Sequence, residues 1–284
     1  MLHTLVCALA ATLATHPSDD DSTTEPSTPF LEVAFAAADG LEITADLYRP
    51  SRPAGERAAP SSGDERSTPF IVLCHQAGSS RGEYRSIAPR LNDLGFHCLA
   101  IDQRSGAEIA GVPNETARRA EAAGQRPTYV DAEQDVLAAL RFARESYGAG
   151  PLLVLGSSYS SALALRIAGE HAGIVDGVLA FAPGEYFLRL GKPEGWIASS
   201  AAKVAVPCFI ASAKHEHQRW RAIFAALPDD SKVFFLPESE GEHGARALWP
   251  NSDASEAYWR ATASFLERFG VAEEPVERAA RLGG

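Results

Sequence analysis

Hydrophobic and polar side chains alternate along residues 30–35 and again along residues 41–48. Successive side chains of a strand point to opposite faces, so each stretch predicts a β-strand with one buried face. An Ala-Asp-Gly sequence at 38–40 separates them and is typical of a hairpin turn. The two strands are therefore expected to pair antiparallel. Residues 49–68, rich in proline, serine, glycine and charge, predict a surface loop after them.

Beyond this hairpin the apolar residues gather into short, uninterrupted runs, at 70–74, 98–101, 151–155, 206–211 and 232–236. Such runs predict strands that are buried on both faces. Helical patterns stand between them: one covers 84–94 and ends at Gly95, and another opens with a capping box at Asp131. Alternating strands and helices predict an α/β fold, with a mostly parallel central sheet, helices on both faces and functional loops at the carboxyl ends of the strands.

The ends of the chain differ in composition from this single domain, which is expected to span residues 29–271. Residues 1–28 predict a leader and a disordered tether, because an apolar core at 4–14 resembles that of a signal peptide and Asp, Ser, Thr and Pro dominate residues 15–28. This leader favours export, periplasmic or secreted, over a cytoplasmic location, although no lysine or arginine precedes its core. The core is about half as long as a membrane span. Residues 272–284 are expected to form a C-terminal tail.

Composition narrows the classes of partner. The chain has 284 residues, of which 45% are hydrophobic, enough for one large core. Its formal net charge of −11 argues against nucleic acid and anionic membranes as partners. The four cysteines do not make a disulfide framework. Cys74 and Cys98 fall on predicted strands that can be neighbours, which leaves one disulfide between them open.

A serine-rich turn at residues 156–160 follows one buried strand and opens a helix of small residues. A strand, a sharp turn with serine at its apex and a helix form the nucleophile elbow of serine hydrolases. That turn needs small residues two positions before and two after the nucleophile, and Gly156 and Ser160 stand there around Ser158. Ser157 fails, because a leucine precedes it by two. Ser160 satisfies the rule but lies farther past the strand, so Ser158 is the predicted nucleophile and Ser160 the alternative.

An activated serine also needs a general base and an acid that orients it, and hydrolases of this kind carry them later in the chain, acid first. The strand at 206–211 leads to Glu216, three positions after a small residue, Ala213. The strand at 232–236 leads into a loop that ends in His243 and a glycine. With these motifs the chain, from about residue 30 to about residue 270, resembles the α/β-hydrolase superfamily, most closely its dienelactone-hydrolase-like branch.

Other residues near these motifs compete for the same roles. Glu242 adjoins His243, but neighbours in one loop rarely face each other well enough to hold an imidazole. Asp229 and Asp230 fit a turn that ends a helix. A metal site is a further alternative, because three histidines stand close together in the pattern: His215, His217 and His243. Since the predicted triad of Ser158, Glu216 and His243 already uses one of them, no metal is expected.

The resemblance also implies an oxyanion hole after the strand at 70–74. There the family usually has His-Gly, whereas this chain has His75 and Gln76. In the resemblance His75 fixes the loop and transfers no proton. The backbone N–H of Gln76 or Ala77 would pair with that of Tyr159 to bind the oxygen that becomes negative during the reaction.

Two segments are expected to shape the substrate site. Residues 105–128 form a polar insertion, and residues 183–207 occupy the position where many relatives insert a lid. About 25 residues are too few for a separate cap domain, so the site is expected to be shallow and open. Tyr186 and Trp196 are the predicted apolar wall.

Together these features predict a Ser-His-Glu hydrolase that cleaves small-molecule carboxylic esters through a covalent acyl-enzyme, without a cofactor. The serine argues against the activity of dienelactone hydrolases themselves, which use cysteine. Two alternatives remain: a serine peptidase or acyl transferase on the same fold, and an inactive binding protein of that fold. A peptidase would normally bring a large extra domain, and an inactive relative would usually lack a triad member. The sequence leaves the oligomeric state open.

Overall fold

The computed structural model describes residues 30–50, 67–148 and 150–270. The predicted leader, tether and C-terminal tail lie outside these residues, as does most of the expected surface loop at 49–68. Within the described part of the chain, no helix is long and apolar enough to cross a membrane.

One sheet of eight strands runs through the described residues, in the order β1-β2-β4-β3-β5-β6-β7-β8. In chain order the strands are β1 (Phe30–Ala36), β2 (Glu42–Tyr48), β3 (Phe70–Cys74), β4 (His97–Ile101), β5 (Leu152–Ser157), β6 (Gly177–Phe181), β7 (Cys208–Ala211) and β8 (Lys232–Phe235). The predicted hairpin is confirmed, since β1 and β2 pair antiparallel. β2 is also antiparallel to β4, and from β4 to β8 all neighbours are parallel.

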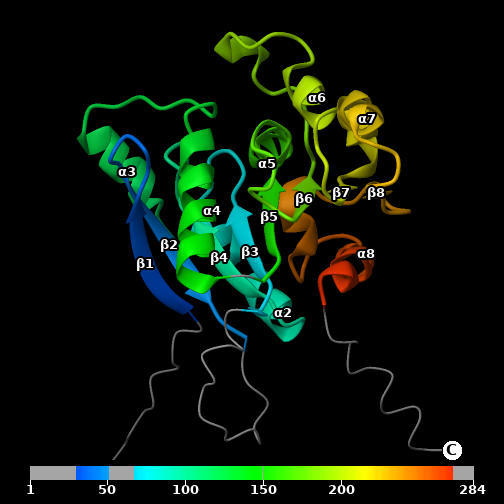
Figure 1. Ribbon diagram of the computed structural model, residues 1–284, viewed down its shortest axis with the longest axis horizontal. Helices are drawn as coiled ribbons and strands as arrows, with labels where there is room; N and C mark the ends of the chain where they lie inside the picture. The colour runs from blue at the N-terminus through cyan, green and yellow to red at the C-terminus, as the bar shows by residue number, and fades with distance from the viewer. Residues whose placement is uncertain (1–29, 51–66, 149, 271–284) are drawn as a thin grey trace, which may run out of the picture.

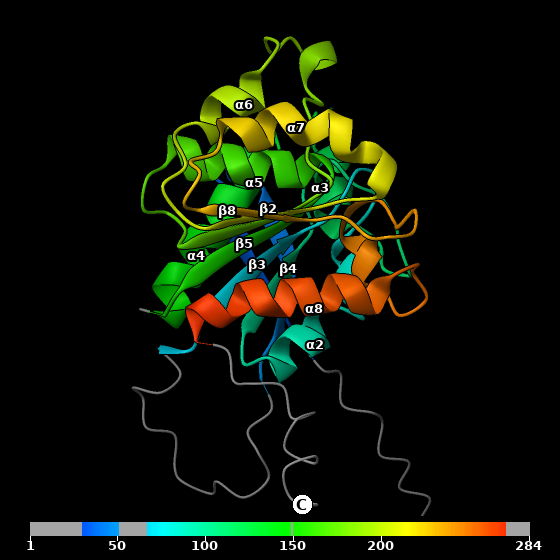
Figure 2. The ribbon, with the colours of Figure 1, turned by 90° about the vertical axis from the view of Figure 1, so that its right-hand side faces the viewer.

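Helices cover both faces of this sheet, as expected (Figure 1). They are α2 (Ala88–Asp93), α3 (Glu115–Ala122), α4 (Glu133–Tyr147), α5 (Tyr159–Glu170), α6 (Trp196–Ala201), α7 (His217–Ala226) and α8 (Ser255–Leu266). Figure 2 shows α5, α6 and α7 on one side of the sheet and α2 and α8 on the other. Short 3₁₀ helices join them: η1 (Arg81–Tyr84), η2 (Leu188–Leu190), η3 (Lys214–Glu216), η4 (Gly244–Leu248) and η5 (Glu267–Phe269).

The uninterrupted apolar runs are explained by two cores, one on each face of the sheet. All five residues of β3 are buried. Val72 and Cys74 pack into the core beneath α4 and α5, whereas Ile71 and Leu73 pack into the core beneath α2 and α8. Because successive side chains of a strand point to opposite faces, a strand between two cores has no polar position.

Two local expectations are corrected by the structure, and one open question is answered. The helix expected at 84–94 is two pieces, η1 and the shorter α2, which has a proline in its first turn. α4 begins at Glu133 without a side-chain cap, and the carboxylate of Asp131 instead accepts the backbone N–H of Thr128 at 2.6 Å. Asp131 therefore stabilises the preceding turn and is not a helix cap. The thiols of Cys74 and Cys98 are both free and buried, so no disulfide joins them.

Candidate active site

A strained turn joins β5 to α5 and carries Ser158. This residue has φ 57° and ψ −121°, and α5 begins at the next residue. A non-glycine residue rarely adopts positive φ, so the conformation must be held by its surroundings. The backbone N–H of Ser158 donates to the carbonyl of Phe181 at 2.7 Å, and the Ser161 hydroxyl donates to the Ser158 carbonyl at 2.6 Å. A Cβ on Gly156 would lie 2.5 Å from the backbone of Ser160, so this position requires glycine.

The structure brings Ser158, His243 and Glu216 together from the carboxyl ends of three parallel strands. His243 lies in the loop after β8, and its Nε2 is 2.9 Å from the Ser158 hydroxyl oxygen. Glu216 closes η3 after β7, and its Oε1 is 2.7 Å from Nδ1 of His243. Since a carboxylate can only accept, Nδ1 carries a proton and Nε2 is free to accept the proton of Ser158.

The surroundings of Glu216 keep its carboxylate charged. Its side chain is 3% exposed, and burial alone would raise its pKa. The hydrogen bond to His243 and the nearby positive charge of Arg219 oppose burial and hold the pKa of Glu216 below its ordinary value. Glu216 is therefore ionised at neutral pH, where it can stabilise a positively charged imidazole.

The residues that competed with Ser158 and Glu216 in the sequence bind other groups in the structure. The carboxylate of Glu242 accepts the backbone N–H of His243 at 3.1 Å and does not face the imidazole. Asp229 forms an ion pair with Lys232. The hydroxyl of Ser160 donates to the carbonyl of His75 instead of facing His243. The geometry thus singles out Ser158 among the serines of the turn.

The loop after β3 contacts the turn that carries Ser158, since the Ser160 hydroxyl donates to the carbonyl of His75. His75 is buried, and burial lowers the pKa of its imidazole. Nδ1 donates to the carbonyl of Gln76 at 2.8 Å, and Nε2 accepts the backbone N–H of Gln103 at 3.0 Å, so the ring is neutral and fixes the loop. The backbone N–H of Gln76 donates to the buried carboxylate of Glu83 at 2.9 Å. It is therefore occupied, whereas the N–H groups of Ala77 and Tyr159 have no acceptor among the described residues.

The aromatic residue after the elbow is enclosed by polar and aromatic neighbours. The hydroxyl of Tyr159 is 2.9 Å from the side-chain amide of Gln103 and 3.0 Å from the Ser105 hydroxyl. The ring of Tyr129 stacks on that of Tyr159, with centroids 4.5 Å apart. These contacts link the elbow to the predicted insertion at 105–128.

The two residues predicted as a substrate wall differ in position. The Tyr186 hydroxyl interacts with Ser158 and donates to the carbonyl of Ala182 at 2.6 Å. Burial raises the pKa of Tyr186 to about 12, so it stays a neutral phenol. Trp196 packs at 5.1 Å against Phe187 and beneath the guanidinium of Arg166. Only Tyr186 reaches the serine, so the prediction that Trp196 walls the site has no contact to support it.

The histidines considered as metal ligands do not converge. Nδ1 of His215 is 3.8 Å from Glu240, and the ring of His217 packs between Trp220 and Phe234. In the described ranges, no group of three or more His, Cys, Asp or Glu residues is arranged to hold a metal ion.

Comparison with known proteins agrees with this geometry. Residues 65–213 match the family model described as serine aminopeptidase, S33. The chain belongs to this family. Membership confirms the expected place in the α/β-hydrolase superfamily and makes the protein a hydrolase of the serine class. A search of curated protein sequences finds no match.

Solved structures share the fold at low sequence identity. An esterase from Pyrococcus furiosus has a TM-score of 0.63 at 15% identity, with 86% of this chain and 93% of that chain covered. A dienelactone hydrolase from Anabaena variabilis has a TM-score of 0.60 at 16% identity, covering 85% and 99%. An acylaminoacyl peptidase from Pyrococcus horikoshii has a TM-score of 0.57 at 16% identity, covering 88% of this chain but 43% of that chain.

One feature of this hydrolase site was not predicted. It is Glu83, which directly precedes the helix expected at 84–94, so nothing in its local pattern indicates a bond to the oxyanion loop. The insertion at 105–128, which was expected to shape the substrate site, supplies much of the lining of a cavity of about 910 Å³ between the loops after β3 and β4. Gly78 and Tyr129 complete this lining with others.

Proposed function

We propose that the protein cleaves carboxylic esters, with Ser158 as nucleophile, His243 as general base and Glu216 as the acid that orients His243. The observation that carries this proposal is the unbroken hydrogen-bonded chain from Glu216 through His243 to a serine held at positive φ between a strand and a helix. A structural serine needs neither the strained backbone nor a partner histidine with a buried carboxylate behind it.

The geometry supports a two-step reaction. The hydroxyl oxygen of Ser158 attacks the carbonyl carbon while Nε2 of His243, at 2.9 Å, takes its proton. The charged imidazole is stabilised by Glu216 and then returns the proton to the leaving alcohol oxygen. Ser158 is left as an acyl ester. Water, deprotonated by His243, attacks this ester, and the carboxylic acid leaves with the enzyme restored.

The negative oxygen of each tetrahedral intermediate needs two donors. We assign the backbone N–H groups of Tyr159 and Ala77, because Glu83 already takes the N–H of Gln76. Each such donor contributes about 3 kcal/mol to lowering the barrier. The bond from Gln76 to Glu83 gives the loop a fixed shape, so the Ala77 donor needs no reorganisation during the reaction.

Amide hydrolysis is the second candidate, since the family model is described as serine aminopeptidase and one structural neighbour is an acylaminoacyl peptidase. Ester hydrolysis is favoured because the chain covers 93% of the esterase but only 43% of that peptidase. An acyl transferase would use the same acyl-enzyme and an alcohol in place of water.

Matched substrates separate these functions. A p-nitrophenyl ester and a p-nitroanilide with the same acyl group should differ in kcat/KM by at least about 10³ in favour of the ester, and Ser158→Ala should abolish both activities. Comparable rates on ester and anilide would favour the peptidase. Preferred transfer to an added alcohol over water would favour the transferase, and activity that survives Ser158→Ala would refute the proposed nucleophile.

A further inference from the structure

A large cavity lies between the loops after β3 and β4, next to residues that flank the proposed oxyanion hole. We call it the α3 cavity; it has a volume of about 910 Å³, and its lining includes Gly78, Ser105, Asn114, Ala117, Tyr129 and Leu190. Gly78 directly follows Ala77, and Ser105 and Tyr129 both contact the ring or hydroxyl of Tyr159. The cavity therefore lies next to the neighbour of Ala77 and to side chains that contact Tyr159, while Ala77, Ser158 and His243 are not part of its lining. Its volume is in the range of sites that enclose small-molecule ligands.

The position of His243 decides which half of an ester can enter this cavity. The leaving oxygen must lie within hydrogen-bond reach of Nε2 to receive its proton. His243 follows β8 and Glu216 follows β7, on one side of the elbow, whereas most of the cavity lining follows β3 and β4, on the other. Figure 1 shows α3 and α7 on opposite sides of α5. The alcohol consequently points toward β8 and the acyl group toward the α3 cavity.

The lining of the α3 cavity carries little unbalanced charge. The guanidinium of Arg104 is already bound by the carboxylates of Asp39 and Asp135. The remaining charged residues of the lining are exposed and balanced, two arginines and two glutamates: Arg118, Arg126, Glu108 and Glu121. The rest of the lining is uncharged: it combines small residues, two prolines, Leu190 and the Tyr129 ring with polar side chains that include Asn114 and Gln125. An uncharged acyl group suits such a surface better than a carboxylate or an ammonium group, which would lose hydration without a partner.

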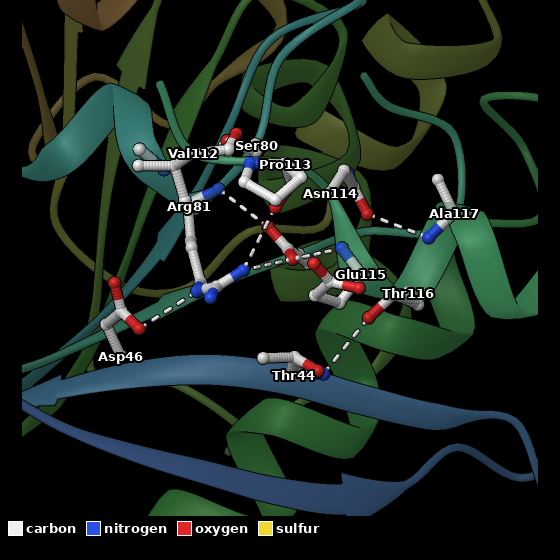
Figure 3. A network of polar contacts seen from close by, with 12 residues as sticks. Thr44, Asp46, Ser80, Arg81, Val112, Pro113, Asn114, Glu115, Thr116 and Ala117 are labelled. Atoms are coloured by element: carbon white, nitrogen blue, oxygen red, sulfur yellow. Dashed lines mark hydrogen bonds and ion pairs between the residues drawn. The ribbon is translucent and has the colours of Figure 1, made fainter. Parts of the chain in front are cut away.

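The wall of the cavity is anchored to the sheet before any substrate binds. Figure 3 shows Arg81 joined to Asp46 on one side and to the start of α3 on the other. The guanidinium of Arg81 also pairs with Asp102 at 2.6 Å, and that carboxylate accepts the backbone N–H of Glu115 at 2.8 Å.

Asn114 ties the same wall to the oxyanion loop. Its side-chain amide lies 3.1 Å from Nε2 of His75 and donates to the carbonyls of Ser79 and Gln103, while its oxygen caps α3 at Ala117. A cavity that is held open in this way binds a rigid group without an ordering cost.

We propose, on the basis of the ester hydrolysis proposed above, that the α3 cavity is the acyl-binding site and that it selects bulky, uncharged acyl groups. Small acyl groups such as acetyl leave the cavity unfilled. A cyclic or branched acyl group buries apolar surface against Ala117, Leu190 and Tyr129 and so gains transition-state binding.

Filling the cavity tests this assignment. Ala117→Phe places a ring in the cavity, and Ala122→Phe is the matched control, because Ala122 is an exposed residue of the same helix outside the lining. The substrates are p-nitrophenyl acetate, p-nitrophenyl cyclohexylacetate and the mono-p-nitrophenyl ester of adipic acid, whose acyl group ends in a carboxylate. Each kcat/KM is divided by the rate constant for alkaline hydrolysis of the same ester.

The wild-type protein should favour cyclohexylacetate over acetate, and over the adipate ester, by about tenfold or more. Ala117→Phe should lower the cyclohexylacetate-to-acetate ratio by about tenfold, and Ala122→Phe should leave both the ratio and acetate hydrolysis unchanged. An unchanged ratio in Ala117→Phe would overturn the acyl site. If no ester is cleaved, the proposed function itself fails. If acetate is hydrolysed in a Ser158-dependent way but Ala117→Phe leaves the cyclohexylacetate-to-acetate ratio unchanged, only the acyl site is overturned.

Discussion

Replacing Glu216 by glutamine removes the negative charge behind His243 while keeping the shape of the side chain. In the structure Oε1 of Glu216 is 2.7 Å from Nδ1, and the other oxygen, Oε2, is buried without a hydrogen-bond partner among the described residues. The charge therefore acts chiefly on His243. A glutamine amide can donate to Nδ1, which moves the ring proton to Nε2 and removes the acceptor that Ser158 needs.

The expected loss arises from this change of tautomer. In serine hydrolases with this arrangement, neutralising the acid lowers kcat by about 10⁴. That factor corresponds to about 5 kcal/mol of barrier. Because the imidazolium also loses a stabilising charge, the acid limb of the pH profile of kcat/KM should move to lower pH in Glu216→Gln.

The assay is the pH dependence of ester hydrolysis for the wild type, Glu216→Gln and Glu242→Gln, with circular dichroism to confirm folding. Glu242→Gln is the matched control, since its carboxylate bonds a backbone N–H and Arg246 but not the imidazole. The kcat/KM of Glu242→Gln should stay within about threefold of that of the wild type. A folded Glu216→Gln with near-normal kcat, or a stronger loss in Glu242→Gln, would refute the assignment of the acid.

Three further predictions concern stability and the neighbours of the serine. Gly156→Ala should destabilise the fold by at least about 2 kcal/mol, because the new Cβ meets the Ser160 backbone at 2.5 Å; urea unfolding within about 0.5 kcal/mol of the wild type would contradict this. Tyr186→Phe should leave the pH profile unchanged from about pH 6 to about pH 9, since the pKa of Tyr186 is near 12, and a shifted limb would reveal a proton-transfer role. Glu216 has a lowered pKa in the fold, so its charge stabilises the protein above the ordinary carboxyl range and less as pH falls through the folded pKa. The difference in unfolding free energy between wild type and Glu216→Gln should therefore stay constant above about pH 6 and shrink as the pH falls below about 4.3, the ordinary glutamate pKa; a difference that grows over that range would contradict this.

The parts of the site that could be predicted from the sequence are those with a local signal. Ser158, Glu216 and His243 each follow an apolar run at a strand's carboxyl end, and parallel strands bring such ends to one edge. The fold class was predictable for the same reason, because strands between two cores are apolar at every position.

The parts that could not be predicted depend on residues far apart in the chain. Glu83 directly precedes the helix expected at 84–94, and only the fold brings its carboxylate to the backbone N–H of Gln76. Arg81 joins β2 to the loop after β4 and to the segment before α3, and no short-range pattern encodes these contacts. Asp131 fits a capping box in sequence, yet its carboxylate accepts hydrogen bonds from the backbone N–H and the hydroxyl of Thr128.

Covalent labelling with a fluorophosphonate probe tests the central claim most directly. Only a serine activated by a neighbouring imidazole reacts with such a probe, so the intact protein should gain the mass of one adduct. Peptide mapping should place the adduct on Ser158, and Ser158→Ala should prevent labelling. An adduct on Ser160, or no adduct on the folded wild-type protein, would contradict the account.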